Sequence, residues 1–269
     1  MEHTFSEIAV KCNESDMILI GIGEEFQYDW DILLQNKRYQ EIERELEEKE
    51  KEQKKEYRWI VPFIQKMALE KYPDQKLARA YQNLHKLVEG HNYFIISIST
   101  DDYVYRYGFQ ENRIVTPCGG FRQMQCDHNC GGQIMETDEE TYRSVLAYFR
   151  GDIELEELSE PVCERCGQKK RFNQLGVSKY AEEGYLTQWG VYTKWLQGTV
   201  NKKISLIELG AGMEMPTVVR WPFEKIVHYN QKAFLYRIHP ALYQLGENMG
   251  GRGAGIKEKS VVFLANGFV

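Results

Sequence analysis

Short apolar runs alternate with longer amphipathic stretches along this chain. Residues 16–23 (DMILIGIG) and 92–100 (NYFIISIST) are apolar runs bounded by polar residues or glycine, which is typical of buried parallel strands. Between them, residues 57–72 and 77–90 repeat apolar side chains at helical spacing, and Gly90 is a candidate C-cap. The order strand, helices, strand predicts a parallel α/β sheet.

The second half of the chain continues this alternation. Residues 182–200 have helical periodicity, 203–212 (KISLIELGAG) predict a third strand that ends in Gly-x-Gly, and 232–239 (KAFLYRIH) predict a fourth. The run 259–269 (KSVVFLANGFV) predicts a fifth strand. We interpret the glycine run 250–255 (GGRGAG) as a mobile loop, with wrapping of phosphates as the alternative.

Charged residues dominate the stretch 31–57. Glu and Lys/Arg recur there three and four residues apart, which predicts a solvated helix. A coiled-coil partner is the alternative, although apolar a and d positions are sparse. Further along, Thr137 followed by Glu140 indicates a capping box at the start of another helix.

The composition narrows the class of protein. With 269 residues and 42% hydrophobic content, the chain can form one sizeable core plus a small satellite. Its net charge of −6 argues against nucleic acid as the main partner. No apolar run approaches membrane-spanning length, and the N-terminus has no basic-then-apolar leader. We therefore expect a cytoplasmic protein without a membrane partner.

Four cysteines form two close pairs, Cys126-x3-Cys130 and Cys163-x2-Cys166. Two such pairs supply the four soft ligands that tetrahedral zinc prefers, and paired cysteines in the cytosol bind metal more often than they form disulfides. Glycines suited to tight turns follow the pairs, at Gly131, Gly132 and Gly167. We expect a closed, structural zinc site; two disulfides, loose thiols, or His128 in place of one cysteine are the alternatives.

These elements combine into a domain hypothesis. The fold class is α/β, a Rossmann-like parallel sheet with an inserted small zinc-ribbon module and a helical insertion. We assign 1–122 and 172–269 to the Rossmann-like domain, with the helical insertion at 27–90, and 123–171 to the zinc module.

Five sequence landmarks follow one another along the chain. They are ILIGIG (18–23), IISISTDDYVYRYGF (95–109), VTPCGGF (115–121), the cysteine pairs, and LIELGAGMEMP (206–216). In these landmarks and in their order, the chain resembles the sirtuin family across nearly its whole length. The segments YLTQWGVYTKWL, LIELGAGMEMPTVVRWPFEKI and KAFLYRIHP look most like the macrodomain-linked, class M sirtuins of bacteria.

The resemblance implies an NAD-dependent protein deacylase or ADP-ribosyltransferase; class M enzymes are ADP-ribosyltransferases linked to a lipoyl carrier protein. It implies zinc as a structural cofactor, NAD as a substrate, and a protein partner or an acyl- or lipoyl-type carrier protein. Carried onto this sequence, the implied catalytic positions are Ser99, Asp101 and Cys118. The implied cofactor-binding positions are Gly21, Gly23, Asp101, Gly210, Gly212 and Arg237.

Several of these positions depart from the family pattern. Glu24 and Glu25 follow the first glycine turn, where acids repel a pyrophosphate. Ser99 replaces the strand-end Asn, and Cys118 stands where the family has its catalytic His or, in class M, Gln. Asp101 either contacts the cofactor or caps the following helix. Cys118 is either a nucleophile or a small apolar filler.

Two roles are also open for residues of the loop after the third predicted strand and at the end of the fourth. Gly210, Gly212 and Pro216 suit a loop on the adenine or ribose side of a cofactor, or an ordinary strand-to-helix turn. Arg237 either meets a phosphate or forms a satisfied pair with His239 at the strand end.

Two functions follow. The first is a divergent sirtuin-like protein that retains NAD or ADP-ribose binding as an option but has lost most catalytic residues, and so is non-catalytic or altered in activity. The alternative is an active NAD-dependent deacylase or ADP-ribosyltransferase, a transferase that acts on a carrier protein.

Overall fold

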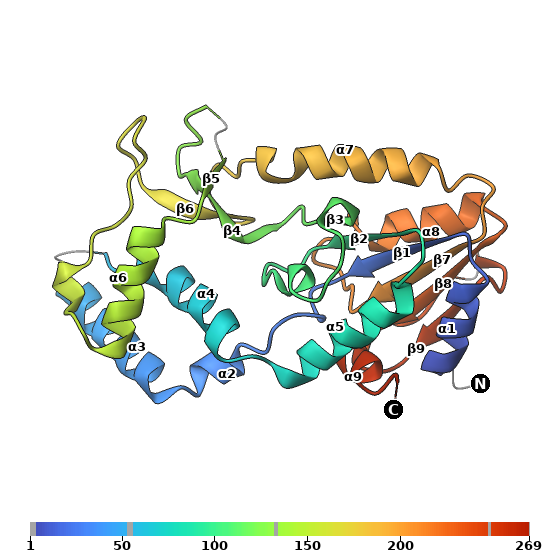
Figure 1. The fold of residues 1–269 in the computed structure, drawn as a ribbon, viewed down its shortest axis with the longest axis horizontal. Coiled ribbons are helices and arrows are strands. Elements are labelled where there is room, and N and C mark those ends of the chain that lie inside the picture. The colour runs from blue at the N-terminus through green and yellow to red at the C-terminus, as the bar shows by residue number, and fades with distance from the viewer. Residues whose placement is uncertain (1–3, 53–55, 132–133, 247–248, 269) are drawn as a thin grey trace. The chain divides into compact units, whose positions relative to one another are not determined.

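The computed structural model describes residues 4–52, 56–131, 134–246 and 249–268 (Figure 1). The chain divides into two compact units. We call Met1–Gln27, Gln75–Cys118 and Tyr185–Val269 the sheet unit, and Tyr28–Asp74 and Gly119–Gly184 the cysteine unit.

Six parallel strands form the sheet unit, in the order β3-β2-β1-β7-β8-β9. Counted along the chain, this is the order 3-2-1-4-5-6 of doubly wound, Rossmann-type sheets. The strands are β1 (Met17–Ile22), β2 (Tyr93–Ser97), β3 (Ile114–Val115), β7 (Ile204–Leu209), β8 (Ala233–Ile238) and β9 (Gly253–Ile256). The predicted parallel α/β sheet is confirmed. Its topological switch point lies between β1 and β7.

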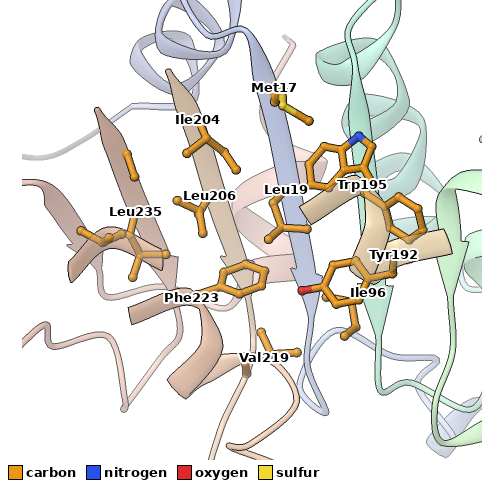
Figure 2. Packing of buried hydrophobic residues seen from close by; sticks show 14 of the residues in the cluster. Met17, Leu19, Ile96, Tyr192, Trp195, Ile204, Leu206, Val219, Phe223 and Leu235 are labelled. Atoms are coloured by element: carbon orange, nitrogen blue, oxygen red, sulfur yellow. The ribbon is translucent and has the colours of Figure 1, made fainter. Parts of the chain in front are cut away.

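The main apolar core lies on one face of this sheet. Helices α7 (Glu183–Gln197) and α8 (Arg220–Tyr229) place Trp195 and Phe223 against Leu19 and neighbouring strand residues (Figure 2). Ile18 and Ile20 are also fully buried, and they point to the opposite face because side chains alternate along a strand. Three helices belong to the other layer of the unit: α1 (Phe5–Asn13), α5 (Gln75–Val88) and α9 (Ser260–Ala265).

The predicted fifth strand at 259–269 is wrong. This run contains the helix α9, which packs against α5, where the Asn83 side chain donates hydrogen bonds to the carbonyls of Leu264 and Ala265. A short apolar run suits a buried strand and a buried helix equally well, so periodicity alone did not separate the two.

The prediction of a mobile loop at 250–255 is also wrong, because the second half of that run belongs to the edge strand β9. Gly250 and Gly251 form the preceding turn with φ values of 57° and 74°. A Cβ on Gly255 would lie 2.3 Å from the carbonyl oxygen of Tyr243. The glycines therefore permit a tight turn and a close backbone approach at the sheet edge.

The cysteine unit combines a small antiparallel sheet with helices. Its strands pair in the order β5-β4-β6. They are β4 (Gly119–Cys126), β5 (Ile134–Glu136) and β6 (Lys170–Gln174). The helices are α2 (Asp31–Leu34), α3 (Lys37–Lys51), α4 (Val61–Lys71) and α6 (Glu139–Arg150).

Two predictions about these helices need correction. The charged stretch 31–57 is not a wholly solvated helix: α3 buries Tyr39, Ile42 and Leu46, and the Tyr148 hydroxyl of α6 donates to Glu45 over 2.6 Å. Helix α6 is capped by Asp138, whose side chain accepts from the Thr141 amide, rather than by the predicted Thr137. The Thr137 hydroxyl instead donates to the Phe121 carbonyl over 3.2 Å.

The unit boundaries differ from those expected from the sequence. Residues 28–74 group with the cysteine segment 119–184, whereas α5 at 75–88 belongs to the sheet unit. Helix α4 contacts α6, and α5 contacts α9, so tertiary packing divides the predicted insertion 27–90 between the two units. None of the described helices is long and apolar enough to span a membrane.

Candidate functional site

Two glycine turns meet at the switch point of the sheet. Gly23 follows β1, and Gly210 and Gly212 follow β7. A Cβ on Gly23 would lie 2.1 Å from the Cα of Ala211, and Gly210 has a φ of +62°. Gly21 lies within β1, where it makes room for side chains of α8. The turns are therefore packed backbone to backbone at the place where open α/β sheets bind ligands.

Glu25 packs against the second glycine turn, where a Cβ on Gly210 would lie 2.7 Å from its Oε2, and its carboxylate also reaches α9. Its carboxylate accepts hydrogen bonds from the backbone amide and the hydroxyl of Ser260, at the first residue of that helix. Burial raises the pKa of Glu25, and the hydrogen bonds from Ser260 partly oppose this rise. Glu25 therefore has a structural role as a cap.

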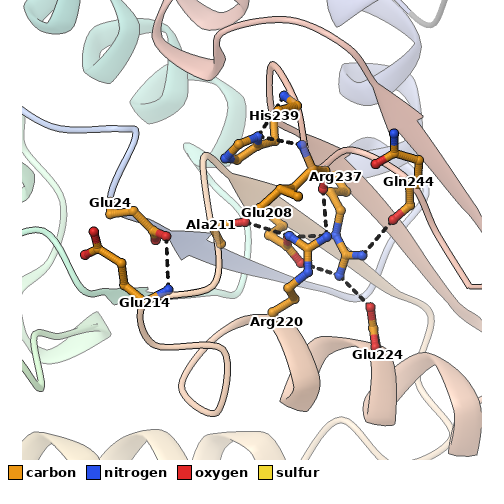
Figure 3. Close-up of polar contacts among 11 residues, drawn as sticks. Glu24, Glu208, Ala211, Glu214, Arg220, Glu224, Arg237, His239 and Gln244 are labelled. Carbon is orange, nitrogen blue, oxygen red and sulfur yellow. Dashed lines mark hydrogen bonds and ion pairs between the residues drawn. The ribbon is translucent and has the colours of Figure 1, made fainter.

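Glu24 lies over the second glycine turn. A Cβ on Gly212 would lie 2.1 Å from Oε1 of Glu24, and the Glu214 amide donates to the same oxygen over 3.4 Å (Figure 3). Oε2 of Glu24 is buried without a hydrogen-bond partner among the described residues. The Glu24 carboxylate thus occupies the space over Gly212, next to the Glu214 amide.

A buried ion network supports the carboxyl ends of β7 and β8. Arg237 is 1% exposed and donates to both carboxylate oxygens of Glu208, over 2.7 and 2.9 Å. It also donates to Glu224 over 2.9 Å and to the Gln244 carbonyl over 3.0 Å. In this structure, the guanidinium for which a cofactor phosphate was one of two expected partners pairs with the buried Glu208 and the partly exposed Glu224. Its role toward a cofactor stays a prediction.

Arg220 and His239 extend this network toward the glycine turn. Arg220 donates to the carbonyls of Ala211 and Leu242, over 2.8 and 2.7 Å. The Nδ1 atom of His239 accepts from the Ala241 and Leu242 amides, which requires an imidazole unprotonated at that nitrogen. Burial and the charge of Arg220 lower the pKa of His239. An acidic residue within an apolar strand, Glu208, indicates a buried ion pair. We did not predict this pair from the sequence because its partners are distant along the chain.

Ser99 and Asp101 follow β2 at the same edge of the sheet, and both are buried. The Ser99 hydroxyl accepts from the Asp101 amide over 3.5 Å, and Oδ1 of Asp101 accepts from the Tyr103 amide over 3.0 Å. Tyr103 begins a short 3-10 helix, Tyr103–Tyr105. Asp101 therefore stabilises the turn that precedes this helix, whose N-cap is Asp102, and its catalytic role stays a prediction.

Cys118 follows β3 and is 3% exposed within the apolar core. Burial and the charges of Glu214 and Glu24 raise the pKa of Cys118 to about 11. The thiol is therefore protonated near neutral pH. These observations favour the apolar filler over the nucleophile.

The four paired cysteines converge within the cysteine unit. Their sulfur atoms all lie within 4.8 Å of one another, with Cys126 and Cys166 3.4 Å apart and Cys130 and Cys163 3.5 Å apart. Backbone amides of the turn, from Arg165 and Cys166, lower the pKa of Cys163 to about 7. This donor set fits a tetrahedral metal ion with no open position.

Neighbouring residues match the expected turns in part. Gly131 and Gly167 have φ values of 108° and 71°, as tight turns require. The third predicted turn residue, Gly132, lies outside the described residues. His128 is exposed and does not belong to the group of clustered ligand atoms.

Comparisons with known proteins agree with this geometry. No protein-family model matches the chain. A Staphylococcus aureus protein named "Protein ADP-ribosyltransferase" is 25% identical over 191 residues, 70% of this chain and 59% of that protein. A Fusarium oxysporum f. sp. cubense protein named "Probable bifunctional ADP-ribose hydrolase/ADP-ribosyltransferase" is 24% identical over 144 residues, 51% of this chain and 24% of that protein. The chain spans less than two thirds of either.

Solved structures show the fold. A structure on the basis of sirtuin substrate affinity is similar with a TM-score of 0.56 and 14% identity, covering 99% of this chain and 98% of the other. A Sir2 homologue in complex with NAD is similar with a TM-score of 0.51 and 14% identity, covering 98% and 93%. The predicted resemblance is confirmed: the chain has the sirtuin fold. The names of both curated relatives include ADP-ribosyltransferase.

Proposed function

We propose that this chain is a divergent sirtuin-fold protein whose NAD or ADP-ribose site is closed by its own acidic residue, so that it is non-catalytic or altered in activity. The observation that carries the proposal is the Glu24 carboxylate beside Gly212. A phosphate binds at exposed backbone amides, and a carboxylate at that place repels it. A fold does not by itself confer a reaction.

The state of the remaining site residues supports the same function. The buried Cys118 thiol does not supply a base near neutral pH, and Arg237 is engaged by Glu208 and Glu224. The cysteine cluster would hold a structural zinc ion through its four thiolates. Zinc would add folding free energy to the cysteine unit and would take no part in chemistry.

The alternative is an active NAD-dependent ADP-ribosyltransferase or deacylase with a carrier-type protein as its partner. The names of the curated relatives favour it. It requires Glu24 to leave the glycine turn when NAD arrives, with Asp101 and Ser99 then facing the nicotinamide ribose.

A thermal-shift experiment separates the two functions. Zinc-loaded protein would be melted with NAD, with ADP-ribose and without ligand, for the wild type, Glu24→Ala and the exposed control Glu89→Ala. A ligand at a hundredfold excess over its Kd stabilises a protein by about 2.7 kcal/mol. We expect millimolar ligand to leave the melting temperatures of the wild type and Glu89→Ala unchanged and to raise that of Glu24→Ala.

Equal stabilisation of all three proteins would overturn the closed-site proposal. Release of nicotinamide from NAD by the wild type, lost in Asp101→Asn, would establish the alternative. If Glu24→Ala also failed to bind NAD and ADP-ribose, the Glu24 carboxylate would not be the group that closes the site. The proposal would then be wrong about the cause of closure.

A further inference from the structure

An apolar groove lies on the sheet unit between the end of α7 and α8. Its cavity has a volume of about 410 Å³. Its lining residues are Leu196, Thr199, Val200, Asn201, Pro222, Lys225, Ile226, Tyr229 and Asn230. Two large side chains at the groove are unusually exposed, Val200 by 68% and Tyr229 by 73%. Exposed apolar groups gathered around a hollow are typical of interaction sites.

Hydrogen bonds hold the walls of the groove in place. The Asn230 side chain donates to the carbonyls of Thr199 and Lys202, over 3.2 and 3.0 Å. The Thr199 hydroxyl donates to the Leu196 carbonyl over 2.7 Å. These bonds satisfy backbone acceptors of the loop between α7 and β7, so the apolar side chains rather than the backbone define the surface. A pre-formed site of this kind binds at a low ordering cost.

The segments that form the groove are rich in lysine and poor in acidic residues. Residues 184–207 and 225–246 contain no Asp or Glu, although the chain has 40 acidic residues. The same segments carry exposed lysines at Lys194, Lys202, Lys203, Lys225 and Lys232. Glu224, which precedes Lys225, directs its carboxylate to the buried Arg237. Lys225 lines the groove, the Lys202 carbonyl accepts from the groove residue Asn230, and the Lys232 ammonium donates to the Asn201 carbonyl, so cationic side chains lie beside the groove in a chain whose net charge is −6.

We infer that this groove docks an acidic protein that inserts an aliphatic or aromatic side chain between Val200 and Tyr229, with its carboxylates facing the lysines. A hollow of this size holds one or two side chains, which favours a protein over a lipid surface, since lipid binding uses protruding apolar groups. The lysines disfavour a two-fold contact of groove with groove, because like charges would face each other. The inference is independent of the proposed function, since none of the groove residues belongs to the glycine turns.

Selection from a random peptide library displayed on phage tests the inference. The immobilised targets would be the full chain, Tyr229→Ser, Lys225→Glu, and the control Lys257→Glu, an exposed lysine far along the sequence from the groove. We expect enriched peptides to combine Asp or Glu with Leu, Phe or Trp. As synthetic peptides they should bind Tyr229→Ser and Lys225→Glu at least tenfold more weakly than the wild type, and Lys257→Glu equally well. Their affinity should fall with added salt.

Enriched peptides without an acidic excess, or with equal affinity for all four proteins, would overturn the inference, as would failure to enrich any peptide. Two further measurements distinguish other occupants. Sedimentation velocity that shows a dimer lost in Tyr229→Ser would assign the groove to a second copy. Binding to phosphatidylglycerol vesicles that is lost in the same variant would assign it to a membrane. Melting curves confirm that each variant is folded.

Discussion

The two units of this chain depend on different physical forces. The sheet unit contains 15 acidic and 16 basic residues, a net charge of +1, and encloses a continuous apolar core. The cysteine unit contains 25 acidic and 18 basic residues, a net charge of −7, around a four-sulfur cluster. The sheet unit buries paired charges, whereas the cysteine unit keeps most of its charges at the surface and clusters four thiols. We therefore expect the stability of the sheet unit to depend on apolar packing and that of the cysteine unit on a bound metal ion.

Metal removal should produce the largest contrast between the units. Structural zinc sites contribute about 10 to 16 kcal/mol of apparent binding free energy near neutral pH. A chelator, or the substitution Cys163→Ser, should therefore unfold the surroundings of the cluster and leave the sheet unit folded. Hydrogen exchange followed by mass spectrometry would show protection lost in 119–184 and kept in β1, β2, β7 and β8.

A matched variant controls for histidine ligation. His128→Ala should retain one zinc ion per chain by elemental analysis, because this side chain does not belong to the cluster. Loss of zinc in His128→Ala, or retention of full protection after chelation, would contradict the four-thiolate site.

Breaking the buried ion network should have the next largest effect, confined to the sheet unit. Arg237→Met leaves Glu208 buried at 0% exposure with a weak 3.5 Å contact to Arg220 as its remaining ion pair. Removal of one partner from a buried pair costs about 3 to 5 kcal/mol. Urea unfolding should show this loss, and the double variant Arg237→Met with Glu208→Leu should recover part of it. A loss below about 1 kcal/mol would mean that the network contributes little.

The smallest effect should come from pH: acidification should change the contributions of Glu25 and Asp138 to folding stability in opposite directions, one in each unit. Burial raises the pKa of Glu25, so its contribution to stability is present below its ordinary pKa and is lost as the pH rises through the folded value. Although burial alone would raise it, hydrogen bonds from Thr141 and Lys170 lower the pKa of Asp138. Its contribution is present above its ordinary pKa and is lost as the pH falls through the folded value.

Two amide variants measure these contributions. Relative to the wild type, Glu25→Gln should be most stable near neutral pH, and its advantage should shrink toward pH values near the ordinary carboxyl range. Asp138→Asn should be least stable near neutral pH, and its deficit should shrink on acidification. For one proton the slope cannot exceed about 1.4 kcal/mol per pH unit. Parallel pH profiles for the two variants would contradict the opposite signs.

Sequence patterns alone determined much of this protein. Four strands, the helices between them and the four-cysteine cluster follow from local periodicity and spacing. Periodicity reports which side chains are buried, and a short Cys-x2-Cys or Cys-x3-Cys segment brings its own thiols together. The carboxyl ends of parallel strands share one edge of a sheet, so the residues that follow β1, β2 and β7 lie at the same edge.

Tertiary structure decided the rest. The run 259–269 became a helix because α5 offered it a packing surface, and the glycine-rich edge became a strand because β8 had an open side. The partners of Arg237 and the position of Glu24 depend on contacts between residues tens to hundreds of positions apart. Local sequence carries no information on such contacts. Burial, charge pairing and close backbone approach are properties of the assembled fold, and they determine which residues are available for function.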